Sequence, residues 1–330
     1  MKTLEHYLKI FSKLKRSPHA LWSDATKKKA PHKPILLLAV MDFISRGMLA
    51  TNFIDLSRDL SELNDLFNSY WIRVVPIGQT SSIAFPFSRL HSEGFWKLVP
   101  QPGQASSFRK APEVSTVPQL REVVLGAEIE NDLFLCLQIP GNRRALRQVL
   151  LQSYFSEEAQ RNLEDQARIN ADAYSYSLEL VEKAHEPLVW ERVASIEYKP
   201  APVRDQGFRR AVVTTYNHRC ALCGVRMVTP DGHTAVDAAH IKPWSISKND
   251  DIRNGMALCK LCHWSFDEGF IGVSKNYDVV VSTQLNSGTN MPGLLSTLHK
   301  RSLITPDDKE LWPAQEYLEW HRQEFKLNRA

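Results

Sequence analysis

The sequence has few cysteines and no long hydrophobic run, and both absences restrict what the protein can be. The longest apolar run, residues 35–41, ends at Asp42 and is far shorter than the ~20 residues that cross a bilayer. The first residues lack the apolar stretch of a secretory signal. We therefore expect a cytoplasmic protein without a membrane partner. Five cysteines in 330 residues are too few for a disulfide scaffold.

The length and the charge distribution indicate two domains with different surfaces. A chain of 330 residues with 43% hydrophobic residues can form two packed cores. The net charge of +4 is unevenly spread, because residues 1–33 hold nine lysines and arginines against two acids. Such a basic segment suits a polyanionic partner, although the lysine run at residues 27–29 is also typical of a solvated surface.

Apolar periodicity predicts a largely helical first half with a few strands. The expected helices cover residues 4–14, 34–44, 56–67, 120–125, 132–137 and 143–155, and the expected strands cover residues 82–87 and 95–99. An acidic stretch then leads to Pro200-Ala201-Pro202, which reads as a rigid boundary. We expect domains at residues 1–165 and 203–330, joined by an acidic, partly helical linker at residues 166–202.

Four of the five cysteines form two Cys-x-x-Cys pairs, Cys220 with Cys223 and Cys259 with Cys262. Two such pairs give a closed four-sulfur shell, which is typical of structural zinc, whereas a redox site needs only one pair. The remaining Cys136 lies in an apolar run and reads as a buried thiol. The sequence therefore predicts one structural Zn²⁺.

Two histidines and an asparagine lie close to these cysteines in the sequence. His240 ends a strand-like segment, Asn254 follows in the next loop, and His263 comes directly after Cys262. Together these residues resemble the His-Asn-His motif of HNH nucleases, over about residues 208–271. The resemblance implies a zinc-stapled ββα-metal fold and metal-dependent hydrolysis of DNA.

The resemblance also implies a role for each residue. His240 is expected to take a proton from water, since an imidazole titrates near neutral pH. Asn254 is expected to hold that imidazole or its loop, and His263 to bind a catalytic Mg²⁺ or Mn²⁺. The alternative is that both histidines are zinc ligands or packed side chains, but four thiolates already complete a zinc shell.

The second ligand of the catalytic ion stays open. Many HNH nucleases have a ligand directly before the base, where this chain has Ala239. Asp267 is favoured, because it lies four positions after His263 and shares its helix face. Asp237 is the other candidate, but in a regular strand it faces away from His240. The alternatives are a helix-end hydrogen-bonding role for Asp267 and a turn role for Asp237.

Two segments of the first domain carry a second resemblance. They are residues 30–38, which include His32 and Lys33, and residues 84–96, which include Phe85, Pro86 and Arg89. With gaps, residues 4–165 resemble the sulfur-binding domain of McrA-like, type IV restriction endonucleases, which recognises phosphorothioate-modified DNA.

This resemblance implies a pocket for a non-bridging sulfur, which is softer and less hydrated than oxygen. Phe85 and Pro86 are expected to form its apolar wall, although the family often has Tyr in place of Phe85. His32, Lys33 and Arg89 are expected to hold the neighbouring phosphates. The alternative is that the aromatic residues are core and that the prolines only begin a buried helix.

These patterns predict an α+β protein, with a mixed helical DNA-recognition domain followed by a small zinc-stapled nuclease domain. The expected function is cleavage of double-stranded DNA near phosphorothioate marks, in defence against foreign DNA. Two alternatives stay open: a nuclease that acts on methylated or unmodified DNA, and a zinc DNA-binding module that does not cleave. Whether two chains pair as a homodimer also stays open.

Overall fold

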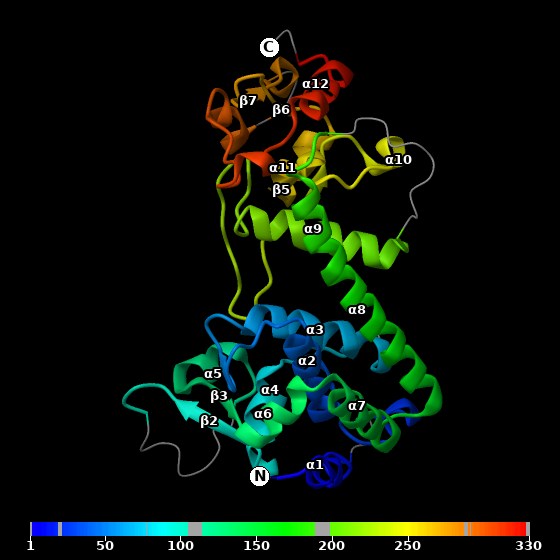
Figure 1. Ribbon diagram of the computed structural model, residues 1–330. Helices are drawn as coiled ribbons and strands as arrows, with labels where there is room; N and C mark the ends of the chain where they lie inside the picture. Colours follow the sequence, from blue (N-terminus) through cyan, green and yellow to red (C-terminus); the bar gives the residue numbers. More distant parts are fainter. Residues whose placement is uncertain are drawn as a thin grey trace. The chain divides into compact units, whose positions relative to one another are not determined.

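The computed structural model describes residues 2–18, 22–76, 78–104, 114–188, 199–286, 290 and 292–327 (Figure 1). Contacts divide the chain into two compact units. The first contains Met1–Ala171 with the short segment Thr229–His233, and the second contains Asp172–Val228 and Thr234–Ala330. The mixture of helices and short sheets confirms the expected α+β class.

The first unit is mainly helical, with one small sheet. Its elements are α1 (Leu4–Phe11), η1 (Asp24–Thr26), α2 (His32–Ser45), β1 (Phe53–Asp55), α3 (Leu60–Val74), α4 (Ala84–Arg89), η2 (Leu90–Glu93), β2 (Trp96–Pro100), α5 (Val117–Val123), β3 (Val124–Ile129), α6 (Asn131–Gln138) and α7 (Pro140–Tyr154). The helix α8 (Glu157–Lys183) follows, and the boundary between the units falls inside it.

The helix α2 forms the centre of the first core. Every residue from Lys33 to Ile44 is buried, which matches a helix that is apolar on nearly all sides. Pro34 lies in its first turn, where a missing N–H costs no hydrogen bond. Neighbouring helices α3, α4 and α7 contact it (Figure 1). The N-terminal end of α2 therefore carries His32 on a rigid support.

A three-stranded antiparallel sheet has the order β1-β3-β2. The strand β2 confirms the strand expected at residues 95–99. The central strand β3 was not predicted, because residues 120–125 read as a helix that in fact ends at Val123. Local periodicity could not separate a short helix from the strand that directly follows it.

The strand expected at residues 82–87 is wrong, because this segment forms the helix α4. The apolar residues that matter are Ile83, Phe87 and Leu90, which are all fully buried and are spaced by four and then three positions. That spacing is helical, whereas the apparent alternation at Ile83, Phe85 and Phe87 suggested a strand. Phe85 is instead 38% exposed.

The described part of the second unit combines helices with two two-stranded sheets. Its elements after α8 are α9 (Ala201–Thr215), β4 (Val236–His240), α10 (Trp244–Ser247), η4 (Ile252–Asn254), β5 (Gly255–Cys259), α11 (Lys260–Asp267), β6 (Ile271–Val273), β7 (Val279–Val281), η5 (Thr283–Asn286), η6 (Gly293–Leu298), η7 (Lys309–Leu311) and α12 (Gln315–Glu324).

The hairpin of β4 and β5 is followed directly by α11, which is the expected ββα order. The register pairs His240 with Gly255 and Val236 with Cys259. The helix α9 packs on both strands of this hairpin. This arrangement places His240 at the end of β4 and His263 in the first turns of α11.

The expected linker is partly described. Residues 189–198 lie outside the described residues, α8 continues to Lys183, and α9 begins at Ala201. Among the described helices, none has the length and apolar character needed to traverse a lipid bilayer.

Candidate functional site

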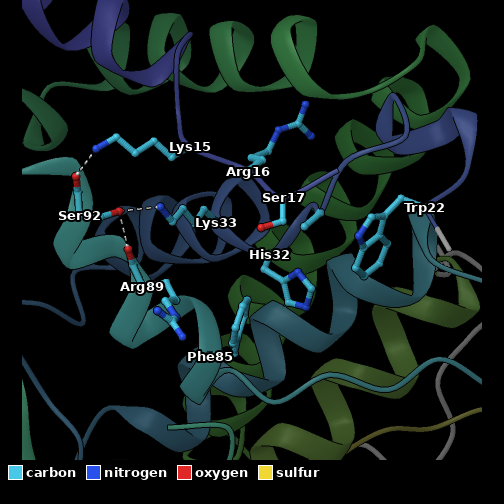
Figure 2. Close-up of a pocket in the computed structure, with 10 residues that line it drawn as sticks. Lys15, Arg16, Ser17, Trp22, His32, Lys33, Phe85, Arg89 and Ser92 are labelled. Carbon is cyan, nitrogen blue, oxygen red and sulfur yellow. Dashed lines mark hydrogen bonds between the residues drawn. The ribbon is translucent and has the colours of Figure 1, made fainter. Parts of the chain in front are cut away.

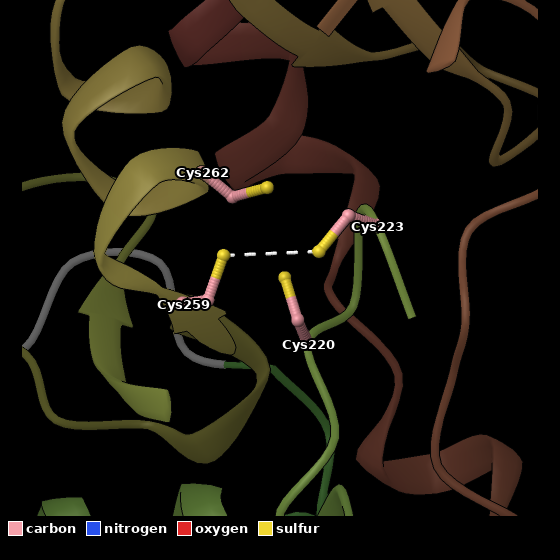
Figure 3. A group of neighbouring side chains, drawn as sticks. All are labelled: Cys220, Cys223, Cys259 and Cys262. Carbon is pink, nitrogen blue, oxygen red and sulfur yellow. Dashed lines mark hydrogen bonds between the residues drawn. The ribbon is translucent and has the colours of Figure 1, made fainter. Parts of the chain in front are cut away.

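The four paired cysteines gather at one point (Figure 3). Their sulfur atoms lie within 4.8 Å of one another, and Cys223 Sγ is 3.7 Å from Cys259 Sγ. A tetrahedral zinc with Zn–S bonds of about 2.3 Å places its sulfurs about 3.8 Å apart. The cluster therefore has the spacing and the donor set of a closed structural metal site.

Proton sharing among these thiols also favours a cation. Hydrogen bonding with Cys223 lowers the pKa of Cys220 to about 6, and hydrogen bonding with Cys220 lowers the pKa of Cys259. The pKa values of Cys223 and Cys262 are raised, because each donates to a neighbouring thiolate. Ionising all four cysteines would place four negative charges within 4.8 Å of one another, which a divalent ion between them would offset.

His240 and His263 line one cavity of about 390 Å³, between the end of β4 and the helix α11. Asp267 also lines it, and His263 Nε2 is 3.5 Å from Asp267 Oδ2. Asp237 is not among the described residues that line this cavity, and its carboxylate pairs with Arg209 at 2.8 Å. Of the two acids, Asp267 is therefore the one placed beside His263.

The imidazole of His240 is held on two sides. Its Nε2 lies 2.8 Å from Asp250 Oδ1, and the side chain of Asp250 is only 3% exposed. Its face stacks on the ring of Phe208 in α9, with centroids 3.9 Å apart and planes within 8°. These contacts leave the imidazole little freedom to rotate.

Asn254 is fully buried behind the cavity. Its Oδ1 accepts from the backbone N–H of Lys242 at 2.8 Å, and its Nδ2 donates to the carbonyls of Lys242 and Asn249 at 3.0 and 3.1 Å. Asn254 thus ties the segment after His240 to the loop before β5. Its side chain therefore bonds to the backbone, and among the described residues it makes no hydrogen bond to the imidazole.

Basic side chains lie close to the same cavity. Trp244 lines the cavity, and both Arg204 and Lys248 approach its ring at 4.0 Å. Lys242 lies 5.9 Å from the ring of Trp320, another lining residue. Arg204 is paired with Asp205 and Asp250, so the charges that suit a polyanion such as a phosphodiester backbone are those of Lys242 and Lys248.

A second cavity, of about 730 Å³, lies in the first unit (Figure 2). It is lined by residues from the basic N-terminal segment, the start of α2 and the region of α4 and η2, namely Lys15, Arg16, Ser17, Trp22, Ala30, His32, Lys33, Phe85, Arg89 and Ser92. Figure 2 shows the rings of His32 and Phe85 side by side, with Arg16 and Arg89 at different edges.

Aromatic rings form one wall of this cavity. The ring of His32 lies 5.1 Å from Phe85 and 5.3 Å from Trp22, which also line the cavity, and 4.8 Å from Trp71, which is not among the described lining residues. Burial lowers the pKa of His32 to about 4, so its imidazole is neutral at pH 7. The wall is therefore uncharged and weakly hydrated, whereas the edges carry arginines.

Two of the residues predicted for this pocket differ from the expectation, because Lys33 lines the cavity but is ion-paired, and Pro86 does not line it. Lys33 donates to Ser92 Oγ at 2.9 Å and forms an ion pair with Glu93, whose side chain is only 5% exposed. Its charge is therefore balanced within the protein. Pro86 is buried in α4 and is not among the described residues lining the cavity.

Sequence reasoning assigned no role to several residues at these sites. Asp250 contacts His240 and Arg16 lines the cavity of the first unit, yet both lie outside the motifs that the sequence analysis used. The sequence offered little indication of a role for Asp250, because acidic residues are common in polar loops such as the one before Asn254. Arg16 was visible only as one of nine basic residues in the first 33.

Comparison with known proteins supports both resemblances. Residues 220–274 match the HNH endonuclease family, and residues 14–172 match the family described as ScoMcrA-like, DNA sulfur-binding domain. No curated protein matches the chain.

A solved structure of the modification-dependent TagI restriction endonuclease aligns with 21% identity and a TM-score of 0.29. The aligned region covers 42% of this chain and 44% of that protein. The present chain thus spans less than half of that protein's length. From the two family matches, the chain is similar to a ScoMcrA-like DNA sulfur-binding domain over its first half and to the HNH endonuclease family over residues 220–274.

Proposed function

We propose that this protein hydrolyses phosphodiester bonds in DNA at the cavity beside β4 and α11. The observation that carries the proposal is that His240, His263 and Asp267 line one cavity within a ββα unit. The adjacent four-thiol cluster and the HNH endonuclease match support the same reading.

Each residue then has a definite task. His240 accepts a proton from the attacking water, and Asn254 keeps the backbone after His240 in place. His263 and Asp267 would hold a divalent ion, Mg²⁺ or Mn²⁺, which when bound offsets negative charge on the phosphate and the leaving oxygen. The four cysteines would hold Zn²⁺, whose role is structural because its shell has no open position.

We further propose that the first unit selects DNA carrying phosphorothioate linkages. A non-bridging sulfur is less hydrated than oxygen, so it gains more from the neutral ring wall of His32 and Phe85. Arg16 and Arg89 stand at the edges, where they can contact the flanking phosphates. The match to a DNA sulfur-binding family supports this assignment.

The proposal is tested with one plasmid prepared with and without phosphorothioate linkages. Purified protein is incubated with each plasmid in Mg²⁺, in Mn²⁺ and in excess chelator, and nicked and linear products are counted. We expect cleavage of the modified plasmid that requires the divalent ion. His240→Ala should reduce the cleavage rate by at least about 10²-fold, the usual contribution of a general base.

The outcomes separate the two parts of the proposal. Equal cleavage of both plasmids contradicts the sulfur preference and leaves nuclease activity in place. Cleavage by His240→Ala at the wild-type rate contradicts the assignment of the base. Binding to modified DNA without cleavage under any ion condition would indicate a binding module.

A further inference from the structure

The surroundings of Asp250 differ from those of an ordinary surface acid. Its Oδ1 faces His240 Nε2 at 2.8 Å and also accepts from Arg204 Nη1 at 3.3 Å. Its Oδ2 accepts from the hydroxyl of Tyr176 at 3.2 Å. The side chain is 3% exposed, so three protein groups from different segments take the place of water around this carboxylate.

The loop that carries Asp250 is itself fixed. The amide of the preceding Asn249 donates to the Tyr317 hydroxyl at 2.8 Å and accepts from the backbone N–H of Asp251 at 2.9 Å. The carbonyl of Asn249 accepts from Asn254 at 3.1 Å. The carboxylate is therefore presented to His240 by a rigid backbone.

This contact determines which nitrogen of His240 carries the proton. An ionised carboxylate can only accept, so the neutral imidazole must donate from Nε2. Its Nδ1 then holds the lone pair. Among the described residues, His240 Nδ1 has no hydrogen-bond partner, although His240 lines the cavity. The ring nitrogen that can act as a base is thus the one that the protein leaves open.

We propose that Asp250 is a positioning residue that locks His240 as the Nε2–H tautomer and makes Nδ1 the general base. This inference rests on the proposed nuclease function. As water attacks phosphorus, Nδ1 takes one water proton and the bond from phosphorus to the leaving oxygen breaks. That oxygen gains a proton from solvent. The resulting imidazolium is stabilised by Asp250, with Phe208 fixing the plane of the ring.

The tautomer can be measured without any cleavage assay. Protein labelled with ¹⁵N-histidine is studied by NMR at pH 8, and the His240 signals are identified by their loss in His240→Gln. We expect a protonated Nε2 and an unprotonated Nδ1 in the wild type. A wild-type His240 protonated on Nδ1 would overturn the proposal. This readout stands even if the protein cuts no DNA.

The contribution to rate is measured with Asp250→Asn under single-turnover conditions. An amide can donate to Nε2 and thereby favour the wrong tautomer. We expect a rate loss of about 10²-fold or more, with DNA affinity close to wild type and a melting temperature that is lowered but stays above the assay temperature. Asp205→Asn is the matched control, because Asp205 also pairs with Arg204, whereas the carboxylate that bonds to His240 is that of Asp250.

Two results would contradict this role for Asp250. One is a wild-type rate in Asp250→Asn. The other is a rate loss of equal size in Asp205→Asn, which would place the effect in the Arg204 network. If the wild type itself cuts no substrate, the proposed function fails, and the NMR result still decides the tautomer.

Discussion

His32 shows how burial sets the chemistry of a single residue. Burial lowers its pKa from 6.5 to about 4, so the unfolded chain binds a proton between these pH values while the folded protein does not. The free energy of unfolding should therefore fall as the pH drops from 6.5 towards 4. His32→Phe should weaken this pH dependence, measured by urea unfolding at several pH values.

The control for this prediction is His91→Phe, since His91 is exposed on η2 of the same unit. Burial also lowers the pKa of His321 in the second unit, but that contribution is present in all three proteins and cancels in the comparison. An unchanged pH dependence in His32→Phe would contradict a neutral His32 in the folded protein.

At the residue scale, the sequence indicated the functional residue types better than their partners. His240 and His263 were predicted from a motif, and both line one cavity. The ion pair of Lys33 with Glu93 could not be predicted from the sequence, because these residues lie on different elements and no local pattern connects them. Pairing across such a distance depends on packing.

Among the elements, the hairpin of β4 and β5 depends on one small residue. Gly255 faces α9, and a Cβ added there would lie 2.6 Å from Val212 Cγ2 and 2.9 Å from Phe208 Cζ. Because Phe208 also stacks on His240, Gly255→Ala should disturb the site as well as the core. We expect a loss of about 1–3 kcal/mol in unfolding free energy and slower cleavage.

Chemical denaturation and single-turnover cleavage of Gly255→Ala test this prediction. Gly141→Ala in α7 is the control, since an added Cβ there meets nothing within 4 Å. It should leave the cleavage rate unchanged. Wild-type stability in Gly255→Ala would show that α9 can move away from the hairpin at little cost.

The cysteine cluster should determine the stability of the ββα unit. The four thiols come from the segment after α9, from the end of β5 and from α11, so a bound ion joins three elements. Removing zinc with a strong chelator should unfold the second unit and leave the first folded. Calorimetry should show the loss of one transition, and metal analysis should find about one zinc per chain.

Cys262→Ala should reproduce the effect of the chelator, whereas Cys136→Ala should not. Cys136 is also buried, but it lies in α6 of the first unit, away from the cluster. Retention of zinc and of both transitions in Cys262→Ala would contradict a four-thiolate site.

At the scale of the whole molecule, DNA recognition and cleavage should be separable by substitution. His240→Ala should bind phosphorothioate DNA as tightly as the wild type. Arg89→Ala should bind more weakly. The slope of the logarithm of its affinity against the logarithm of salt concentration should become shallower by about one, as expected for one lost phosphate contact. Phe85→Ser should lose the preference for sulfur and keep the salt slope.

These affinities are measured by fluorescence anisotropy at several salt concentrations, with modified and unmodified duplexes of the same sequence. Equal affinity of the wild type for both duplexes would contradict sulfur recognition in the first unit. A weakened affinity in His240→Ala would mean that the two sites are energetically coupled.

The sequence by itself determined the residue chemistry of this protein. Its two cysteine pairs, the residues His240, Asn254 and His263, and the apolar run of α2 are local patterns, and local patterns follow from spacing along the chain. Only the tertiary structure decided which groups meet. It brought Asp250 and Phe208 to His240, balanced Lys33 with Glu93, and made residues 82–87 a helix. The physical reason is that contacts between distant segments depend on how whole elements pack, which short-range periodicity does not encode.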